Sequence, residues 1–287
     1  LTANTDSESS TEGRVYAAGE RIYRFASGRH ERAAAAGLQG EVVSMAASGD
    51  ELLVGTRLRG VFRSTNGGQT FSPTSASSRS STVAAHVIRD EGGRWWLRVG
   101  GSLYRSNDGE RWLGPLLPAP VGSLCPYREG IAALAASDEG ATLFLSEDGV
   151  RWARRSLATS GANGRVRMLG ERAVVLDTSR AGAFVEGDAM PWTAGASFLV
   201  NGNEGQLLAV RYESAGDRFV VVEHRAKGAR VIADEGSKLA AVPDGNHHVY
   251  DVTWDGARLW LALGGGVCSV EPKPEHSGGE GGEKGGP

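Results

Sequence analysis

Apolar and polar residues follow one another in short runs, which are separated by turns rich in Gly, Asp and Ser. Each run is short and enriched in Val, Leu, Trp and Tyr, which is typical of antiparallel β-strands. The runs include ELLVGT (51–56), RWWLRV (94–99), AVVLDT (173–178), QLLAVRY (206–212), RLWLAL (258–263), and those that begin at Val42, Val83 and Val249. No helical period is present, and the Ala-rich stretch near Ala33 falls where an outer strand is expected. We therefore predict an all-β protein.

One pattern recurs at intervals of about forty residues: apolar residues, a Ser or its substitute, a Gly-containing turn, and an aromatic residue. It reads VFRSTNGGQTF at Val61–Phe71, LYRSNDGERW at Leu103–Trp112 and LFLSEDGVRW at Leu143–Trp152. With the weaker copies included, the anchor positions are Phe25, Ser64, Ser106, Ser146, Glu186, Glu223 and Val270, which lie 37 to 47 residues apart. This regular spacing extends over nearly the whole chain.

Three or four strands in each period fit one blade of a β-propeller better than a long β-sandwich. We predict a single propeller over residues 14–272, with seven blades of three to four antiparallel strands. Six blades are the alternative, if the first and last periods share one blade. The first period lacks an evident innermost strand. Residues 1–13 are polar and predict a flexible leader, and the Gly-rich residues 273–287 predict a disordered tail.

The turn residues have a local structural explanation. The Asp or Asn side chain can accept backbone N–H bonds, the Gly can adopt a positive φ, and the closing aromatic can pack between blades. The motif resembles the Asp-box, or bacterial neuraminidase repeat. The matching residues are Ser64, Asn66, Gly68 and Phe71 in the first copy, Ser106, Asp108, Gly109 and Trp112 in the second, and Ser146, Asp148, Gly149 and Trp152 in the third.

This resemblance implies a propeller fold and says little about substrate. Asp-boxes occur in sialidases, other glycosidases, photosystem II assembly-factor-like proteins and uncharacterised bacterial propellers, and they lie on the rim opposite the functional face. The last period, from Asp255 to Val267, looks more like the repeat of sensor-kinase periplasmic propellers.

Composition excludes several other classes of protein. The 287 residues include 42 Gly, no run of 18 apolar residues, and two Cys, so neither a membrane-spanning helix nor a disulfide framework is expected. The net charge of −3 comes from the two ends, and no basic stripe indicates nucleic-acid binding. Cys125 and Cys268 are predicted to be unpaired. His86 lies in a candidate innermost strand, where a packed, hydrogen-bonded core histidine is the expected role.

No catalytic signature is present, whether a nucleophile elbow, a zinc-protease motif or a phosphate loop. The sialidase resemblance would require an early Arg-Ile-Pro signature, and Arg21-Ile22-Tyr23 departs from it at the Pro. The adjacent His247 and His248 would point to opposite faces of a strand, so they cannot share a metal. We expect no cofactor and no metal, because the single carboxylate of each turn is a poor Ca²⁺ ligand set.

Arginines recur near the turns that join the second and third strands of successive blades. In a propeller these turns converge on one mouth of the central channel, where several guanidiniums would bind a carboxylate, a phosphate or an acidic peptide. The alternative is that each Arg pairs with a neighbour on its own blade, such as Asp177 or Glu213. The candidate binding residues are Arg57, Arg59, Arg98, Arg180 and Arg211.

We therefore expect a non-enzymatic protein-interaction or scaffold propeller that binds another protein or an acidic peptide at the channel mouth. The alternatives are a sialidase-like glycoside hydrolase or glycan-binding domain, and a sensor domain of a longer protein. The ring is expected to be a monomer or a subunit of a hetero-complex. The Ser/Thr-rich start favours a secreted or periplasmic protein over a cytoplasmic one.

Overall fold

A computed structural model describes most of the chain, and its regular elements are all β-strands. The described residues are 2–4, 14–18, 22–26, 29–77, 84–137, 140–157, 164–169, 171–177, 182–185, 188–189, 198–201, 207–213, 218–225, 228–235, 249–255, 258–263 and 266–270. Over these residues the predicted all-β class is confirmed.

Within the described residues the strands form seven antiparallel sheets, and in each one neighbouring strands are consecutive in the chain. The first four sheets contain β1 (Thr2–Asn4), β2 (Arg14–Ala18), β3 (Ile22–Ala26) and β4 (Arg29–Arg32); β5 (Val42–Ser48), β6 (Glu51–Thr56), β7 (Gly60–Ser64) and β8 (Ser72–Pro73); β9 (Ala85–Arg89), β10 (Trp95–Val99) and β11 (Ser102–Ser106); and β12 (Val121–Tyr127), β13 (Gly130–Ser137), β14 (Gly140–Ser146) and β15 (Ala153–Leu157).

The last three sheets follow the same plan. They contain β16 (Arg165–Leu169), β17 (Arg172–Asp177), β18 (Gly182–Val185) and β19 (Asp188–Ala189); β20 (Phe198–Asn201), β21 (Leu207–Glu213), β22 (Arg218–Arg225) and β23 (Gly228–Glu235); and β24 (Val249–Trp254), β25 (Leu259–Leu263) and β26 (Gly266–Val270). Among the described turns, those at residues 49–50 and 100–101 consist of the Gly and Asp residues that predicted a turn.

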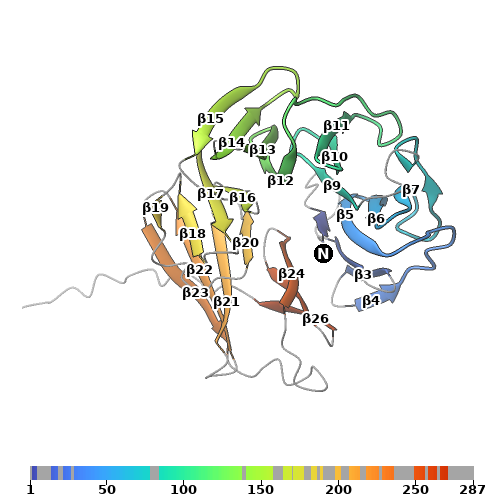
Figure 1. The fold of residues 1–287 in the computed structure, drawn as a ribbon. Coiled ribbons are helices and arrows are strands. Elements are labelled where there is room, and N and C mark those ends of the chain that lie inside the picture. The colour runs from blue at the N-terminus through green and yellow to red at the C-terminus, as the bar shows by residue number, and fades with distance from the viewer. Residues whose placement is uncertain are drawn as a thin grey trace, which may run out of the picture.

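The first strand of each sheet lies on the inside of a ring (Figure 1). These strands contact one another in chain order, β1 with β5, then β9, β12, β16, β20 and β24, and β24 contacts β1 again. The Phe25 and Trp260 rings, from the first and last sheets, are 5.7 Å apart between centroids. Contact between the first and last sheets therefore closes the ring. The two remain separate sheets and share no strand.

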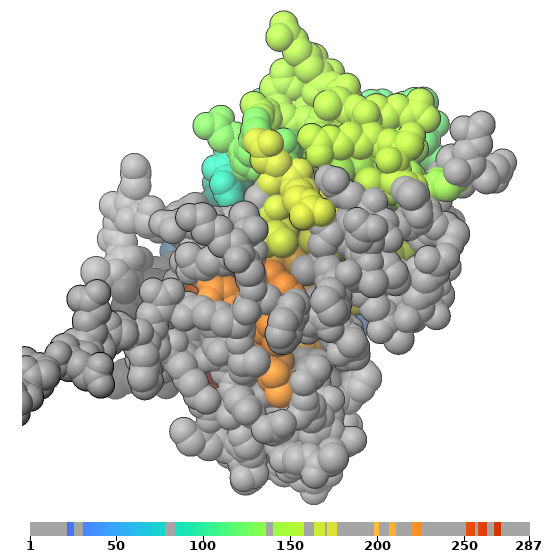
Figure 2. Space-filling view, turned by 90° about the vertical axis from the view of Figure 1, so that its left-hand side faces the viewer, coloured from blue at the N-terminus to red at the C-terminus, as the bar shows by residue number. Residues whose placement is uncertain are grey.

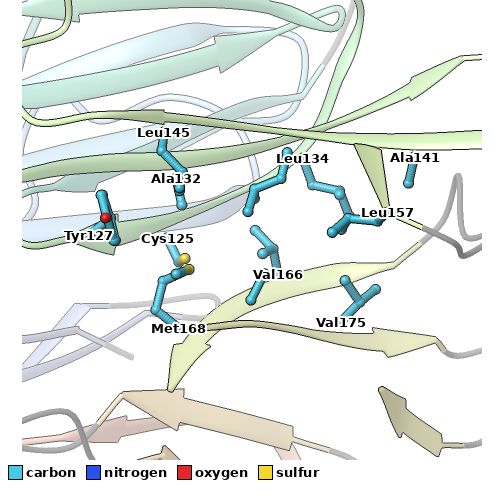
Figure 3. Packing of buried hydrophobic residues seen from close by; sticks show 12 residues of the cluster. Cys125, Tyr127, Ala132, Leu134, Ala141, Leu145, Leu157, Val166, Met168 and Val175 are labelled. Carbon is cyan, nitrogen blue, oxygen red and sulfur yellow. The ribbon is translucent and has the colours of Figure 1, made fainter. Parts of the chain in front are cut away.

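The hydrophobic core is divided among the spaces between neighbouring sheets. One cluster joins the fourth and fifth sheets, where Cys125 and Leu143 pack with Val166, Met168 and Val175 (Figure 3). Corresponding clusters fill the other interfaces from the first sheet to the last. Figure 2 shows the outside of one such junction, where the surface of the fourth sheet (green) adjoins that of the fifth (yellow). At these interfaces neighbouring sheets therefore cover each other's apolar side chains.

Strand β1 corrects one part of the sequence prediction. Its residues belong to the segment predicted as a flexible leader, yet they pair with β2 in the register Ala3 with Val15. This strand takes the innermost position that the first period lacked in the sequence, since it contacts both β5 and β24. A three-residue polar strand has too little hydrophobic pattern to be recognised without its neighbours.

The Ala-rich stretch at residues 33–36 is a connection and contains no helix. The outer strand β4 ends at Arg32, and the chain then runs beside the turn that follows β7. The amide of Ala35 donates to the Gly68 carbonyl at 3.0 Å, and the amide of Phe71 donates to the Ala36 carbonyl at 2.7 Å. In the part of the chain that the structure describes, no helix is long and apolar enough to cross a membrane.

Candidate functional site

The antiparallel pairing gives the ring two distinct ends. Each first strand begins at one end, which we call the front end, and turns into the second strand at the other, the back end. The turns that join second to third strands, such as residues 57–59 and 100–101, therefore lie at the front end. The three Ser-containing turns follow third strands and lie at the back end.

The three back-end turns share one hydrogen-bond pattern. The Ser side chain is buried at the end of the third strand, and its hydroxyl accepts a bond from the amide of the turn Gly. The donors and acceptors are Gly68 to Ser64 at 3.0 Å, Gly109 to Ser106 at 2.9 Å and Gly149 to Ser146 at 2.8 Å. All three glycines have positive φ, as this turn requires.

The Asp or Asn residue of each turn accepts hydrogen bonds from backbone amides. Oδ1 of Asp108 accepts from the amides of Glu110 and Arg111 at 2.9 and 2.8 Å, and these bonds lower the pKa of Asp108 to about 2. Asp148 has the same arrangement and a lowered pKa. In the first turn, which is one residue longer, Oδ1 of Asn66 accepts from the Thr70 amide at 3.0 Å. These side chains are occupied in holding the turn.

The aromatic residue that closes each turn packs between its own sheet and the preceding one. Phe71 lies in the cluster between the first and second sheets, and Trp112 in the cluster between the second and third. Trp152 packs against Trp96 with ring centroids 6.2 Å apart and planes at 82°. The back-end turns thus connect neighbouring sheets.

A second recurring turn went unnoticed in the sequence. Between β9 and β10, the fully buried carboxylate of Asp90 accepts bonds from the Arg94 amide, from Nε of Arg94 and from the Trp96 indole, each at 2.8 Å. Between β24 and β25, Asp255 accepts from the Arg258 amide at 2.7 Å and from the Trp260 indole at 2.6 Å. The shared order Asp, Arg, Trp across a turn was the available signal.

The first two candidate arginines lie in the turn between β6 and β7. Nε of Arg57 donates to Oε2 of Glu41 at 2.7 Å, so this guanidinium is paired with a carboxylate of its own sheet's entry loop. Arg59 packs its aliphatic part over Gly40, where an added Cβ would lie 2.8 Å from Cγ of Arg59. Between them, Leu58 is exposed and has a φ of 64°.

Arg98 lies one residue from the end of β10 and is directly opposite His86 of β9 in the register. Both side chains are half-buried. Arg165, exposed at the start of β16, is close enough for its charge to act on His86 together with that of Arg98. Burial and these two positive charges lower the pKa of His86 to about 4, and burial lowers the pKa of Arg98. We call Arg98, Arg165 and His86 the front-end cluster.

The structure brings one further arginine toward the centre of the ring. Arg167, two residues after Arg165 in β16, donates from Nε to the Leu199 carbonyl at 2.9 Å and from Nη1 to the Val166 carbonyl at 2.8 Å. The charge of Asp251 in β24 also acts on it. The sequence reasoning missed both Arg165 and Arg167. Two arginines at alternate positions of a first strand were the signal for them, because alternate residues share a face.

The remaining candidates are less informative. Arg211 lies within β21 and not in a turn, and Arg180, His247 and His248 lie outside the described residues. His86 is on a first strand as expected, but within the described part of the chain it forms no hydrogen bond, contrary to the expected core role. Cys125 is buried and Cys268 half-buried, and both are free, as predicted. Among the described residues no group of three metal-ligating side chains comes together.

Solved structures with the same architecture cover almost the whole chain. YCF48 bound to D1 peptide matches with a TM-score of 0.64 and 14% identity, over 96% of this chain and 93% of that chain. YCF48 from Cyanidioschyzon merolae gives 0.60 and 12%, over 96% and 95%. The extracellular domain of the putative hybrid two component system BT3049 from B. thetaiotaomicron gives 0.62 and 11%, over 96% of this chain and 40% of that chain.

No protein-family model matches the chain, and no curated protein matches it. At identities of 11 to 14%, the similarity to solved structures shows the fold alone. The ring of antiparallel sheets and these neighbours agree, and the chain has the all-β propeller fold that its forty-residue repeat predicted.

Proposed function

We propose that this chain is a non-enzymatic protein-interaction propeller of seven Asp-box-type blades, which binds an acidic segment of a partner protein at the front end of the ring. The back-end turns support a structural role for the Asp-box residues, because their hydroxyl and carboxylate oxygens are engaged with backbone amides. We therefore assign partner binding to the front end.

The front-end cluster is the observation that carries this proposal. Within the described residues, neither Arg98 nor Arg165 forms a hydrogen bond or an ion pair, and no carboxylate there contacts His86. A half-buried guanidinium is normally paired, because burial without a counter-charge is unfavourable. An acidic segment would supply carboxylates that guanidinium groups bind with strong, charge-assisted hydrogen bonds.

The neighbouring turn extends the same surface. Arg59 has no ion-pair partner among the described residues, whereas Arg57 is already paired with Glu41. We therefore assign the main contribution to Arg98 and Arg165, with Arg59 as an outer contact. YCF48, which has the same fold, has been solved bound to D1 peptide. That precedent supports a peptide as the kind of ligand that this architecture accommodates.

The proposal is tested by measuring the binding of a fluorescent hexa-aspartate peptide by anisotropy at low salt. The double variant Arg98→Gln/Arg165→Gln is expected to bind at least about tenfold more weakly than the unaltered chain, because two charge-assisted contacts are lost. The matched control is Arg151→Gln/Arg154→Gln, which removes the same charge from two exposed residues at the back-end turn and the outer strand β15. The control is expected to bind within about twofold of the unaltered chain, since only screened, long-range charge is removed.

Equal weakening by both double variants would reduce the effect to net charge and contradict a site at the front end. Absence of binding by the unaltered chain at low salt would also contradict the proposal. Circular dichroism spectra and thermal unfolding of the variants establish that each one is folded before its affinity is compared.

A further inference from the structure

We propose that His86 couples binding of the acidic partner to the uptake of a proton, so that the front end binds its partner more tightly as the pH falls. This inference rests on the proposed function and concerns the regulation of the same site. The sequence predicted His86 to be an ordinary core residue.

His86 lies within the site and not beneath it. It is the second residue of a first strand, opposite Arg98 in the register, and it is half-buried. Its strand neighbours Ala85 and Val87 pack into the cluster between the second and third sheets. Because successive side chains alternate, His86 points to the other side, where Ile88 packs against the cluster shared with the fourth sheet.

The charged groups around His86 are positive on the side it faces. Arg98 contributes from β10 and Arg165 from β16. Strand β5 has no titratable residue, and the acid of β6, Glu51, is paired with Arg63 at the back end. The titratable residues of β12, Cys125 and Tyr127, belong to the cluster between the fourth and fifth sheets. Arg89 at the far end of β9, and Asp90 and Glu91 after it, lie at the back end.

In the free protein this surrounding keeps the imidazole neutral. Its pKa is about 4, since burial and the two arginines disfavour the imidazolium form. A bound carboxylate would compensate the charges of Arg98 and Arg165 and add a direct attraction for a protonated ring. The pKa of His86 in the complex would then rise back toward its ordinary value of about 6.5.

The sign of the pH effect follows from these two states. The complex binds a proton that the free protein does not bind at pH values between about 4 and 6.5, so lowering the pH within this range favours the complex. A return to an ordinary histidine pKa corresponds to affinity about tenfold higher at pH 5.5 than at pH 7.5. The aspartates of the probe stay ionised between pH 5.5 and pH 7.5, because their usual pKa is about 3.9.

The experiment measures hexa-aspartate binding at pH 7.5, 6.5 and 5.5, and repeats it calorimetrically at pH 6 in two buffers with different ionisation enthalpies. For the unaltered chain we expect about tenfold tightening and net proton uptake on binding. For His86→Gln, which keeps a polar side chain but cannot titrate, the affinity at each pH is compared with the same variant's affinity at pH 7.5. Its affinity is expected to change less than about twofold across the range, without proton uptake.

The outcomes separate the two proposals. If the unaltered chain binds the peptide equally well at all three pH values, or if His86→Gln keeps the full pH dependence, the coupling to His86 is overturned and the proposed function stands. If the unaltered chain does not bind the peptide at any of these pH values, the proposed function and the coupling fall together.

Discussion

At the scale of single residues, the most consequential side chain that the sequence did not single out is Asp90. Its carboxylate is fully buried and is surrounded by donors, the amide and guanidinium of Arg94 and the indole of Trp96. The Arg94 guanidinium also donates to the backbone carbonyls of Glu129 and Glu147, in turns of the fourth sheet. One carboxylate therefore orients both a buried indole and a link to the next sheet.

The change Asp90→Ala is expected to lower the free energy of unfolding by about 2–4 kcal/mol, because it leaves buried indole and guanidinium donors without their acceptor. Urea denaturation followed by tryptophan fluorescence measures the loss. Asp255→Ala is the comparison, since Asp255 accepts from the Arg258 amide and the Trp260 indole at a site that is only partly buried. A smaller loss is expected there, and an equal or larger loss would contradict burial as the reason.

At the scale of elements, the turns decide how closely the sheets approach one another. Gly149 has a φ of 71°, and a Cβ added to it would lie 2.7 Å from Cη2 of Trp96 and 2.8 Å from Cδ of Arg105, both in the preceding sheet. Gly49, in the turn between β5 and β6, has a φ of 57° and nothing within 4 Å of the added atom. The two glycines share a left-handed backbone conformation but differ in the contacts that an added Cβ would make.

We expect Gly149→Ala to destabilise the fold by more than about 2 kcal/mol, since backbone strain adds to a clash with a ring that is fully buried. Gly49→Ala is expected to lose only about 1 kcal/mol from its left-handed backbone. Chemical denaturation of both variants measures the difference. Equal losses would show that the close approach between the third and fourth sheets contributes nothing to the role of Gly149.

At the scale of the whole molecule, the ring is held together by the apolar clusters between sheets and by the contact of its two ends. Ion pairs also cross between sheets: the pair of Arg63 and Glu110 is partly buried, and the pair of Arg128 and Glu171 is exposed. An exposed pair contributes little on its own. Strand β1 fills the inside position between β5 and β24, so its pairing with β2 completes the inner wall.

The double change Ala3→Pro/Asn4→Pro removes two consecutive backbone donors from β1, one of which must face β2 in an antiparallel pair. We expect the melting temperature to fall by about 5 °C, which corresponds to about 2 kcal/mol in a domain of this size. The control Ala3→Val/Asn4→Thr keeps two good strand residues and is expected to unfold at or above the original temperature. Equal melting temperatures for the two variants, measured by circular dichroism, would contradict a role for β1 in closing the ring.

The sequence by itself determined the strands, their repeat and the turn chemistry, because these depend on residues that are close together in the chain. The run at Glu51–Thr56 is β6 with the predicted bounds, and β24 begins at Val249 as predicted. The hydroxyl of Ser106 and the carboxylate of Asp108 bind amides within three residues of themselves. Alternation and turn preference are local properties, and a regular spacing reveals how often they recur.

Only the tertiary structure decided which groups meet across the ring. Arg57 was a candidate for the binding face, yet its guanidinium binds Glu41, sixteen residues away. Conversely, His86 and Arg165 come from strands of different sheets and act on each other because the first strands converge on one axis. Electrostatic interaction depends on distance in space, and the position of a residue along a repeat does not specify which charge lies opposite it.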